Sequence, residues 1–193
     1  MTTTVGIIFK DGVVLASDQR ATMGHFIACK TAQKIHMLTP FIGFTIAGGV
    51  GDAQELIRLL KSEAAIYALR RGEQMSVTAM NGLLSNFMNQ NRGMPYEVHP
   101  TIGGVDASGP RLFSMDALGG SCEEVKFSAT GSGSPAALGL IEDAYEENMS
   151  EGEAVALAER AIRTAIKRDA GSGERVDIVV ITELGYRKPQ EYK

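Results

Sequence analysis

The alternation of hydrophobic and polar positions predicts β-strands near both ends of the chain and in its middle. Residues 3–9 and 12–18 are short runs rich in Val and Ile. The Asp11-Gly12 step between them is a strong signal for a hairpin. By the same pattern, further strands are expected over residues 33–38, 41–49, 99–106, 111–116, 123–131 and 175–185.

In longer segments the hydrophobic residues recur every three or four positions, which predicts helices. Ser76 and Ser134 are expected to be N-caps, because a serine hydroxyl can accept a hydrogen bond from a free backbone N–H. Pro135 suits a first helical turn, and Gly72 follows a basic last turn. The helices are expected over residues 51–72, 75–92, 131–147 and 150–170.

The order of these elements is strands, two helices, strands, two helices and a strand. This order predicts an α+β fold with antiparallel sheet and paired helices, rather than strict βαβ alternation. The 193 residues fit a single domain over 1–193 that can bury a sizeable core. No apolar run approaches the roughly 18 residues that a membrane helix needs, and the first residues lack the pattern of a secretory signal.

Composition narrows the classes of partner. The net charge of −4 argues against nucleic acid as the main partner, because phosphate binding needs clustered Lys and Arg. Two cysteines, Cys29 and Cys122, are too few for a disulfide framework, so a reducing, cytoplasmic setting is expected. The three histidines, His25, His36 and His99, lack zinc-ligand spacing, so no metal site is expected.

The first residues carry candidate chemistry. If Met1 is removed, Thr2 has a free amine beside its own hydroxyl. A threonine hydroxyl needs a nearby base to act as a nucleophile, and an α-amine with a pKa of about 7.7–8.0 can supply one. Branching at Cβ also restricts the hydroxyl to few rotamers. The alternative is that the three threonines simply begin an edge strand.

Charged residues follow two predicted strands. Asp18 ends a strand, with Arg20 and Thr22 just beyond it, which is equally typical of a polar turn. Lys30 and Lys34 are expected on one strand and on the same face, because their separation is even. This spacing does not decide which lysine points into a site, and a solvated strand face is the alternative.

Glycine-rich segments mark three further junctions. Residues 45–54 run from a strand through glycines into a helix, where free N–H groups can hold an anion or oxyanion. Residues 131–135 could form a phosphate-binding turn, but Ala136 breaks the dinucleotide pattern and no Walker lysine follows. Residues 168–173 are typical of the end of a helix.

Taken together, these segments resemble the β subunits of the 20S proteasome, especially the archaeal type. The resemblance runs from Thr2 to about Thr182 and implies an N-terminal nucleophile hydrolase fold. That fold is a four-layer αββα sandwich, in which two antiparallel sheets are flanked by helices. The segments that carry the resemblance are, in chain order, TTTVGI, GVVLASDQRATMG, KTAQKI, AGGVGDAQ, ATGSGSPAALG and RDAGSG…VDIVVIT.

The resemblance implies a role for each matching residue. The nucleophile matches Thr2, the essential lysine matches Lys34 rather than Lys30, and the oxyanion donor matches the Gly48 N–H. The implied catalytic set is Thr2, Asp18, Lys34, Gly48, Ser132, Asp169 and Ser172. The implied substrate-binding residues are Ala21, Thr22, Ala32, His36, Ile46, Gly48, Val50 and Gln54.

The implied activity is that of a threonine endopeptidase that cleaves unfolded proteins through an acyl-enzyme, mainly after apolar residues. It needs no cofactor, and it becomes active when Thr2 is exposed by autocatalytic cleavage or by an aminopeptidase. The implied partners are other β subunits in a seven-membered ring, α-type subunits and an ATP-dependent unfoldase.

Three alternatives remain open. The chain could be a catalytically silent ring-building subunit or a nucleotide-binding protein that uses residues 131–135. A related bacterial threonine peptidase forms six-membered rings, although residues 131–135 and 168–173 resemble the 20S type instead. His36 departs from the tyrosine or aliphatic residue expected at its position, which leaves the fine specificity open.

Overall fold

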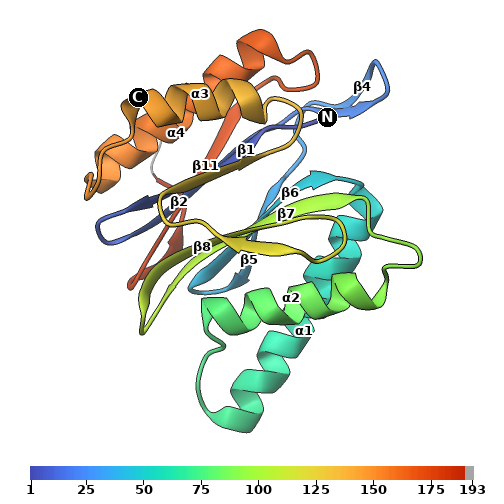
Figure 1. Cartoon of the computed structure of the whole chain (residues 1–193), viewed down its shortest axis with the longest axis vertical. Coiled ribbons are helices and arrows are strands. Elements are labelled where there is room, and N and C mark those ends of the chain that lie inside the picture. Colours follow the sequence, from blue (N-terminus) through green and yellow to red (C-terminus); the bar gives the residue numbers. More distant parts are fainter. Residues whose placement is uncertain (190–193) are drawn as a thin grey trace.

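Two five-stranded antiparallel sheets lie face to face between two pairs of helices, so the chain forms four layers (Figure 1). The structure is a computed structural model that describes residues 1–189. The first sheet has the order β10-β1-β2-β11-β12 and the second the order β5-β6-β7-β8-β9. The α+β sandwich predicted from the sequence is confirmed.

The first sheet contains the beginning and the end of the chain. Its strands are β1 (Thr4–Phe9), β2 (Gly12–Asp18), β10 (Phe127–Thr130), β11 (Val176–Thr182) and β12 (Gly185–Arg187). The second sheet contains the middle of the chain. Its strands are β5 (Ile35–Thr39), β6 (Ile42–Gly48), β7 (Val98–Asp106), β8 (Gly109–Met115) and β9 (Ser121–Glu123). A separate hairpin of β3 (Ala21–Met23) and β4 (Phe26–Cys29) extends beyond the sandwich (Figure 1).

The helices cover the outer faces of the sheets. Helices α1 (Val50–Arg71) and α2 (Val77–Gln90) pack on the second sheet, and α3 (Ser134–Ala144) and α4 (Glu151–Arg168) pack on the first (Figure 1). Strand β2 is buried on both faces, because Val13 and Leu15 contact the core between the sheets whereas Val14 and Ala16 contact the core under α3 and α4.

Three helix ends follow the predicted chemistry. Ser76 accepts a hydrogen bond from the Ala79 N–H, and Gly72 ends α1 in the left-handed region at φ 73°. At the start of α4, Ser150 and Glu153 form a capping box. These contacts satisfy backbone groups that a helix end leaves without partners.

The prediction of the Ser134 cap is wrong, because Ser134 is the first residue of α3 and Gly133 occupies the cap position. Pro135 does lie in the first turn, as predicted.

The prediction of a strand with Lys30 and Lys34 on one face is also wrong. Residues 30–34 form an irregular connection, because the Ala32 N–H turns back to bond the Gln19 carbonyl.

Residues 123–131 do not form one strand. The chain leaves the second sheet after Glu123 and enters the first sheet at Phe127, so the predicted strand is divided between β9 and β10. Strand β12 and the β3–β4 hairpin were not predicted, since each of these strands has only three or four residues.

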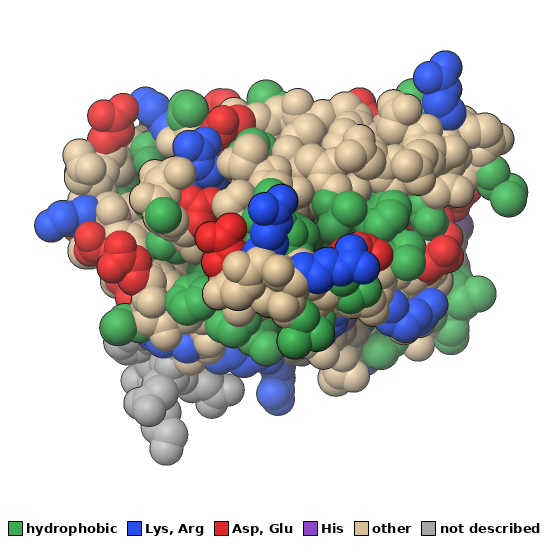
Figure 2. Space-filling model, turned by 90° about the horizontal axis from the view of Figure 1, so that it is seen from below, with side chains coloured by type: hydrophobic (Ala, Val, Ile, Leu, Met, Phe, Trp, Pro, Cys, Tyr) green, Lys and Arg blue, Asp and Glu red, His purple; other side chains and the backbone are tan. Residues whose placement is uncertain are grey.

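The face formed by α1 and α2 mixes hydrophobic with charged side chains when it is seen from below (Figure 2). Ile66 and Leu69 of α1 are exposed hydrophobic residues, as are Met23 and Phe26 of the β3–β4 hairpin.

Within residues 1–189, no helix has the length and the apolar character that crossing a membrane requires.

Candidate active site

Thr2 lies just before β1, where the chain enters the first sheet next to β10. Its backbone packs closely on the turn that follows β10. A Cβ on Gly131 would lie 2.1 Å from the Thr2 carbonyl oxygen, and Gly131 has φ +91°, so only glycine fits there. Because residue 131 is a glycine, the turn after β10 can pack directly against the backbone of Thr2.

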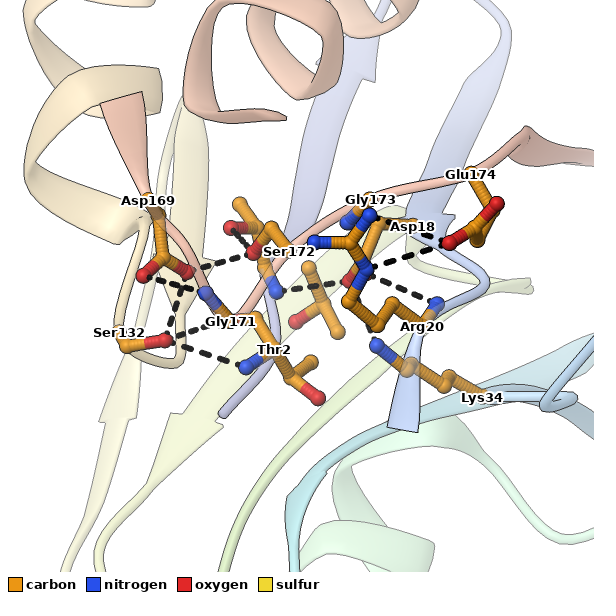
Figure 3. A network of polar contacts seen from close by, with 12 residues as sticks. Thr2, Asp18, Arg20, Lys34, Ser132, Asp169, Gly171, Ser172, Gly173 and Glu174 are labelled. Carbon is orange, nitrogen blue, oxygen red and sulfur yellow. Dashed lines mark hydrogen bonds and ion pairs between the residues drawn. The ribbon is translucent and has the colours of Figure 1, made fainter. Parts of the chain in front are cut away.

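The Thr2 nitrogen begins a chain of hydrogen bonds that ends at Asp169 (Figure 3). It donates to Ser132 Oγ over 3.2 Å, and Ser132 Oγ donates to Asp169 Oδ2 over 2.7 Å. In Figure 3 the nitrogen points to Ser132, whereas the Thr2 hydroxyl points to the opposite side. Among the described residues, nothing forms a hydrogen bond with the Thr2 hydroxyl.

Asp169 follows α4 as its C-cap residue and receives three donors. Ser172 Oγ donates to Oδ2 over 2.7 Å, and the Gly171 N–H donates to Oδ1 over 3.2 Å, in addition to Ser132. Partial burial alone would raise the pKa of Asp169, but the bonds from Ser172, Ser132 and Gly171 outweigh it and lower that pKa. Asp169 is therefore held as a carboxylate beside Thr2.

Asp18 and Lys34 form a buried ion pair on the other side of Thr2 (Figure 3). Lys34 Nζ lies 2.6 Å from Asp18 Oδ1, and Asp18 is fully buried at the end of β2. Backbone N–H groups of Thr3, Arg20 and Gly173 also donate to the Asp18 carboxylate. Both carboxylate oxygens are thus filled, as a buried charge requires.

Burial lowers the pKa of Lys34 from its ordinary value, and the neighbouring Asp18 carboxylate opposes this effect. Lys34 itself is buried, whereas Lys30 is exposed. The structure therefore separates the two lysines that spacing alone left equivalent.

Arg20 connects the end of β2 to the segment that follows α4. Its guanidinium donates to the Ala170 carbonyl and pairs with Glu174 over 3.1 Å. A Cβ on Gly173 would lie 2.2 Å from Arg20 Cζ, so the guanidinium lies directly on that glycine. This contact holds residues 169–174 against Asp18.

Gly48 ends β6 and is followed by Gly49, the N-cap residue of α1. Gly48 shares an open cleft of about 1470 Å³ with Thr2 and Ser132. Its φ of +135° favours glycine, and a Cβ would lie 2.1 Å from the Glu97 carbonyl oxygen. The N-terminus of a long helix adds a partial positive charge at this point. The Gly48 backbone is thus suited to a developing negative charge in the cleft.

Besides Gly48, the predicted substrate-binding residues come from five segments of the chain. Ala21 and Thr22 lie in β3, His36 in β5, Ile46 in β6, and Ala32 in the connection before β5. The remaining two, at the start of α1, are Val50 and Gln54. Of the described residues that line the cleft with Thr2, only Gly48 belongs to the predicted substrate set.

Other residues of the site were not predicted. Thr3, Gly171 and Gly173 supply a hydroxyl or backbone N–H groups to the network. In the sequence, the glycines on both sides of Ser172 were a weak signal for a turn whose backbone N–H groups donate to the site. Within residues 1–189, no group of His, Cys, Asp and Glu side chains could hold a metal ion.

The model of the family described as "Proteasome subunit" matches residues 1–181. The chain belongs to the proteasome subunit family. A protein named proteasome subunit beta from Methanosarcina thermophila is 53% identical over 194 residues, covering 100% of this chain and 92% of the relative. A relative of the same name from Methanospirillum hungatei JF-1 is 58% identical over 187 residues, covering 97% and 90%.

A third proteasome subunit beta, from Methanoculleus marisnigri, is 54% identical over 187 residues, covering 97% of this chain and 87% of the relative. These similarities confirm the predicted resemblance to archaeal proteasome β subunits. The paired antiparallel sheets and flanking helices are consistent with the fold of this proteasome family.

Proposed function

We propose that this proteasome β-type subunit is a threonine endopeptidase whose nucleophile is Thr2 Oγ1. The observation that carries the proposal is the placement of Thr2 between two charged groups. Its nitrogen is linked through Ser132 to Asp169, and the buried Lys34–Asp18 pair lies on the other side. A base and a nearby cation are what a threonine nucleophile needs.

The reaction then has two balanced halves. Thr2 Oγ1 adds to the scissile carbonyl carbon while the free Thr2 amine takes the hydroxyl proton, directly or through water. The Gly48 N–H stabilises the oxyanion, the peptide C–N bond breaks, and the leaving nitrogen takes the proton. Water then adds to the carbonyl carbon of the ester while the Thr2 amine takes one of its protons. The C–O bond of the ester breaks, the amine gives this proton to Thr2 Oγ1, and the acid product leaves. Lys34 favours the neutral amine because a nearby positive charge lowers an amine pKa.

Two alternatives are disfavoured by particular contacts. A silent subunit is expected to lack part of the set, yet Thr2, Ser132, Asp169 and Ser172 are all joined in one network. A nucleotide-binding role for residues 131–135 is disfavoured because this turn already packs on the chain itself. The Gly133 N–H, for example, donates to the Thr2 carbonyl.

We also propose that the chain works inside a proteasome core with other β-type chains and with α-type subunits. The exposed hydrophobic residues of α1 and of the β3–β4 hairpin support this proposal, because such surfaces are typical of protein contacts. Unfolded polypeptide is the substrate class that fits an open cleft beside Thr2.

The test compares two forms of the protein with an epoxyketone, which reacts with the amine and hydroxyl of an N-terminal threonine. A form that begins at Thr2 is expected to gain the mass of one inhibitor per chain and to cleave fluorogenic peptides. A form that keeps Met1 should do neither, because its Thr2 nitrogen is an amide. Full peptidase activity with Met1 on every chain would contradict the proposal, and Thr2→Ala is the control for labelling elsewhere.

A further inference from the structure

Thr3 is fully buried, and its side chain lies at the edge of the Thr2 network. Its Oγ1 is 2.6 Å from Ser172 Oγ, the one hydrogen-bond partner of this hydroxyl within residues 1–189. The backbone of Thr3 bonds instead to Asp18, since its N–H donates to the carboxylate and its carbonyl accepts from the Asp18 N–H. The reaction described above makes no use of the Thr3 hydroxyl.

The chemistry of Asp169 decides which hydroxyl donates in this network. A carboxylate only accepts, so Ser172 and Ser132 each use their single hydroxyl hydrogen on Asp169 Oδ2. The Thr3 hydroxyl must therefore donate to Ser172. Hydrogen bonds run toward Asp169 from both ends: from Thr3 through Ser172, and from the Thr2 nitrogen through Ser132.

The Thr3 hydroxyl is enclosed on its other side as well. A Cβ on Gly133 would lie 2.1 Å from Thr3 Oγ1, so the hydroxyl packs directly against the turn before α3. Ser172 is 1% exposed, which leaves little room for water to replace a lost donor. Without the Thr3 hydroxyl, no group within residues 1–189 would donate to Ser172 Oγ, so its bond to Asp169 alone would fix its orientation.

We propose that Thr3 is a positioning residue for the Thr2 amine: its hydroxyl holds Ser172 in the orientation that donates to Asp169, and so sets how Asp169 acts on the amine through Ser132. This inference rests on the proposed function of Thr2 as nucleophile and base. It assigns to the second threonine of the chain a role that depends on its hydroxyl and not only on its shape.

The direction in which the pKa of the Thr2 amine should move follows from how many donors share the negative charge of Asp169. In the native network two hydroxyls and one N–H share it. If Ser172 turns away, more of the negative charge acts through Ser132 on the amine and favours its protonated form. The charged groups around the amine are Asp169, the Lys34–Asp18 pair and Arg20 with its partner Glu174. Of these, only Asp169 is joined to the Thr2 nitrogen through a chain of hydrogen bonds.

The test uses the full chain released from a fusion so that Thr2 is the first residue. Thr3→Val removes the hydroxyl and keeps a branched side chain, whereas Thr3→Ser keeps the hydroxyl. For Thr3→Val we expect kcat to fall about tenfold with little change in KM, and the acid limb of the pH profile to move up by about half a unit. Thr3→Ser should recover most of the activity and the native pH profile.

Two controls separate positioning from simple destabilisation. Thr78→Val makes the same chemical change on the exposed face of α2 and should leave kcat and the profile unchanged. In a Ser172→Ala background, Thr3→Val should have no further effect, because its action passes through Ser172. A loss of activity without a shift of the acid limb, a lack of recovery in Thr3→Ser, or additive losses with Ser172→Ala would each overturn the proposal. If Thr3→Val does not fold, Thr3→Ala is compared with Thr3→Ser, since these differ by the hydroxyl alone.

A second readout does not depend on peptidase activity. The rate at which an amine-reactive reagent modifies the Thr2 amine is followed against pH, with the product read as the mass of the N-terminal peptide. If the midpoint moves up in Thr3→Val while the native protein cleaves nothing, the proposed function fails and the coupling of Thr3 to the amine stands. If cleavage is normal and the midpoint is the same in both proteins, the role of Thr3 fails and the proposed function stands.

Discussion

The charge of a single residue, Asp18, is compensated mainly by neutral donors. The Asp18 carboxylate has four donors, among which Lys34 is the only one that carries a charge. Removing one partner of a buried ion pair is costly because the other charge remains buried. Lys34 is therefore expected to affect both stability and activity.

Lys34→Ala should abolish peptidase activity and lower the free energy of unfolding by about 1–3 kcal/mol, since three backbone N–H groups still hold Asp18. Lys30→Ala is the matched control on the same connection, and its exposed side chain should matter little for either. Peptidase assays and urea unfolding measure the two effects. Equal losses of activity in the two variants would show that the lysine is wrongly assigned.

His36 is the residue of the predicted substrate set whose charge can change near neutral pH. Burial lowers the pKa of His36 from 6.5, and the nearby charge of Lys61 adds to this effect, while a bond to the backbone at Gln33 opposes it. His36 is therefore neutral at pH 7. A lowered pKa means that it becomes a cation only at a pH below 6.5.

Cleavage after Leu should exceed cleavage after Arg or Glu at neutral pH, because an apolar side chain gains about 1.5–3 kcal/mol on burial. The ratio of cleavage after Glu to cleavage after Leu should rise below pH 6.5 as His36 becomes charged. Tetrapeptides that differ only in the last residue measure this ratio, and His36→Gln should make it independent of pH. A preference for Arg over Leu at pH 7 would refute the assignment of these residues.

Among the secondary-structure elements, helix α4 has a capping box at its first turn and a residue of the site directly after its last turn. Its capping box lies at Ser150, and its last residue is followed by Asp169, which accepts the hydrogen bonds from Ser132 and Ser172. A rigid helix thus holds one end of the network. The helix is stabilised far from the chemistry, at its opposite end.

Ser150→Ala should lower the free energy of unfolding by about 1 kcal/mol, because the Glu153 N–H loses its acceptor. Activity per folded chain should stay unchanged, since Ser150 and Asp169 lie at opposite ends of this 18-residue helix. Urea midpoints measure the change. Ser62→Ala, on the exposed surface of α1, is the control and should not destabilise. An equal loss in both variants would argue against the cap.

At the scale of the whole molecule, the two sheets meet through a tight contact between strands distant in the sequence. Leu112 of β8 is fully buried, and a Cβ on Gly6 of β1 would lie 2.6 Å from its Cδ1. A Cβ on Gly103 of β7 would also come close, at 3.3 Å. The glycines thus provide the space in which Leu112 packs between the sheets.

Leu112→Ala should cost about 2–5 kcal/mol by leaving a cavity, and Gly6→Ala about 1–3 kcal/mol by overpacking. The double variant should be less destabilised than the sum, because the added methyl group occupies part of the space that Leu112 leaves. Urea unfolding of all four proteins closes the cycle. Additive losses would show that the two residues do not share this space.

Much of the architecture follows from local patterns in the sequence. The Asp11-Gly12 hairpin, the Ser76 cap and the Gly72 helix end are each decided by a few neighbouring residues, and the structure has all three. The spacing of hydrophobic residues changes from every second position in strands to every third or fourth position in helices, and this change likewise gives the order of strands and paired helices. Local sterics and hydrogen bonding are sufficient for these features.

Other features depend on contacts between residues that are distant in the sequence, so they become visible only in the folded chain. The sequence pattern predicted one strand with Lys30 and Lys34 on the same face, but the chain turns there and buries only Lys34 against Asp18. Thr3 is one of three similar threonines in the sequence, and its bond to Ser172 joins residues 169 positions apart. A hydroxyl's partner depends on which segments the two sheets and α4 bring together, because burial and hydrogen bonding act in space and not along the chain.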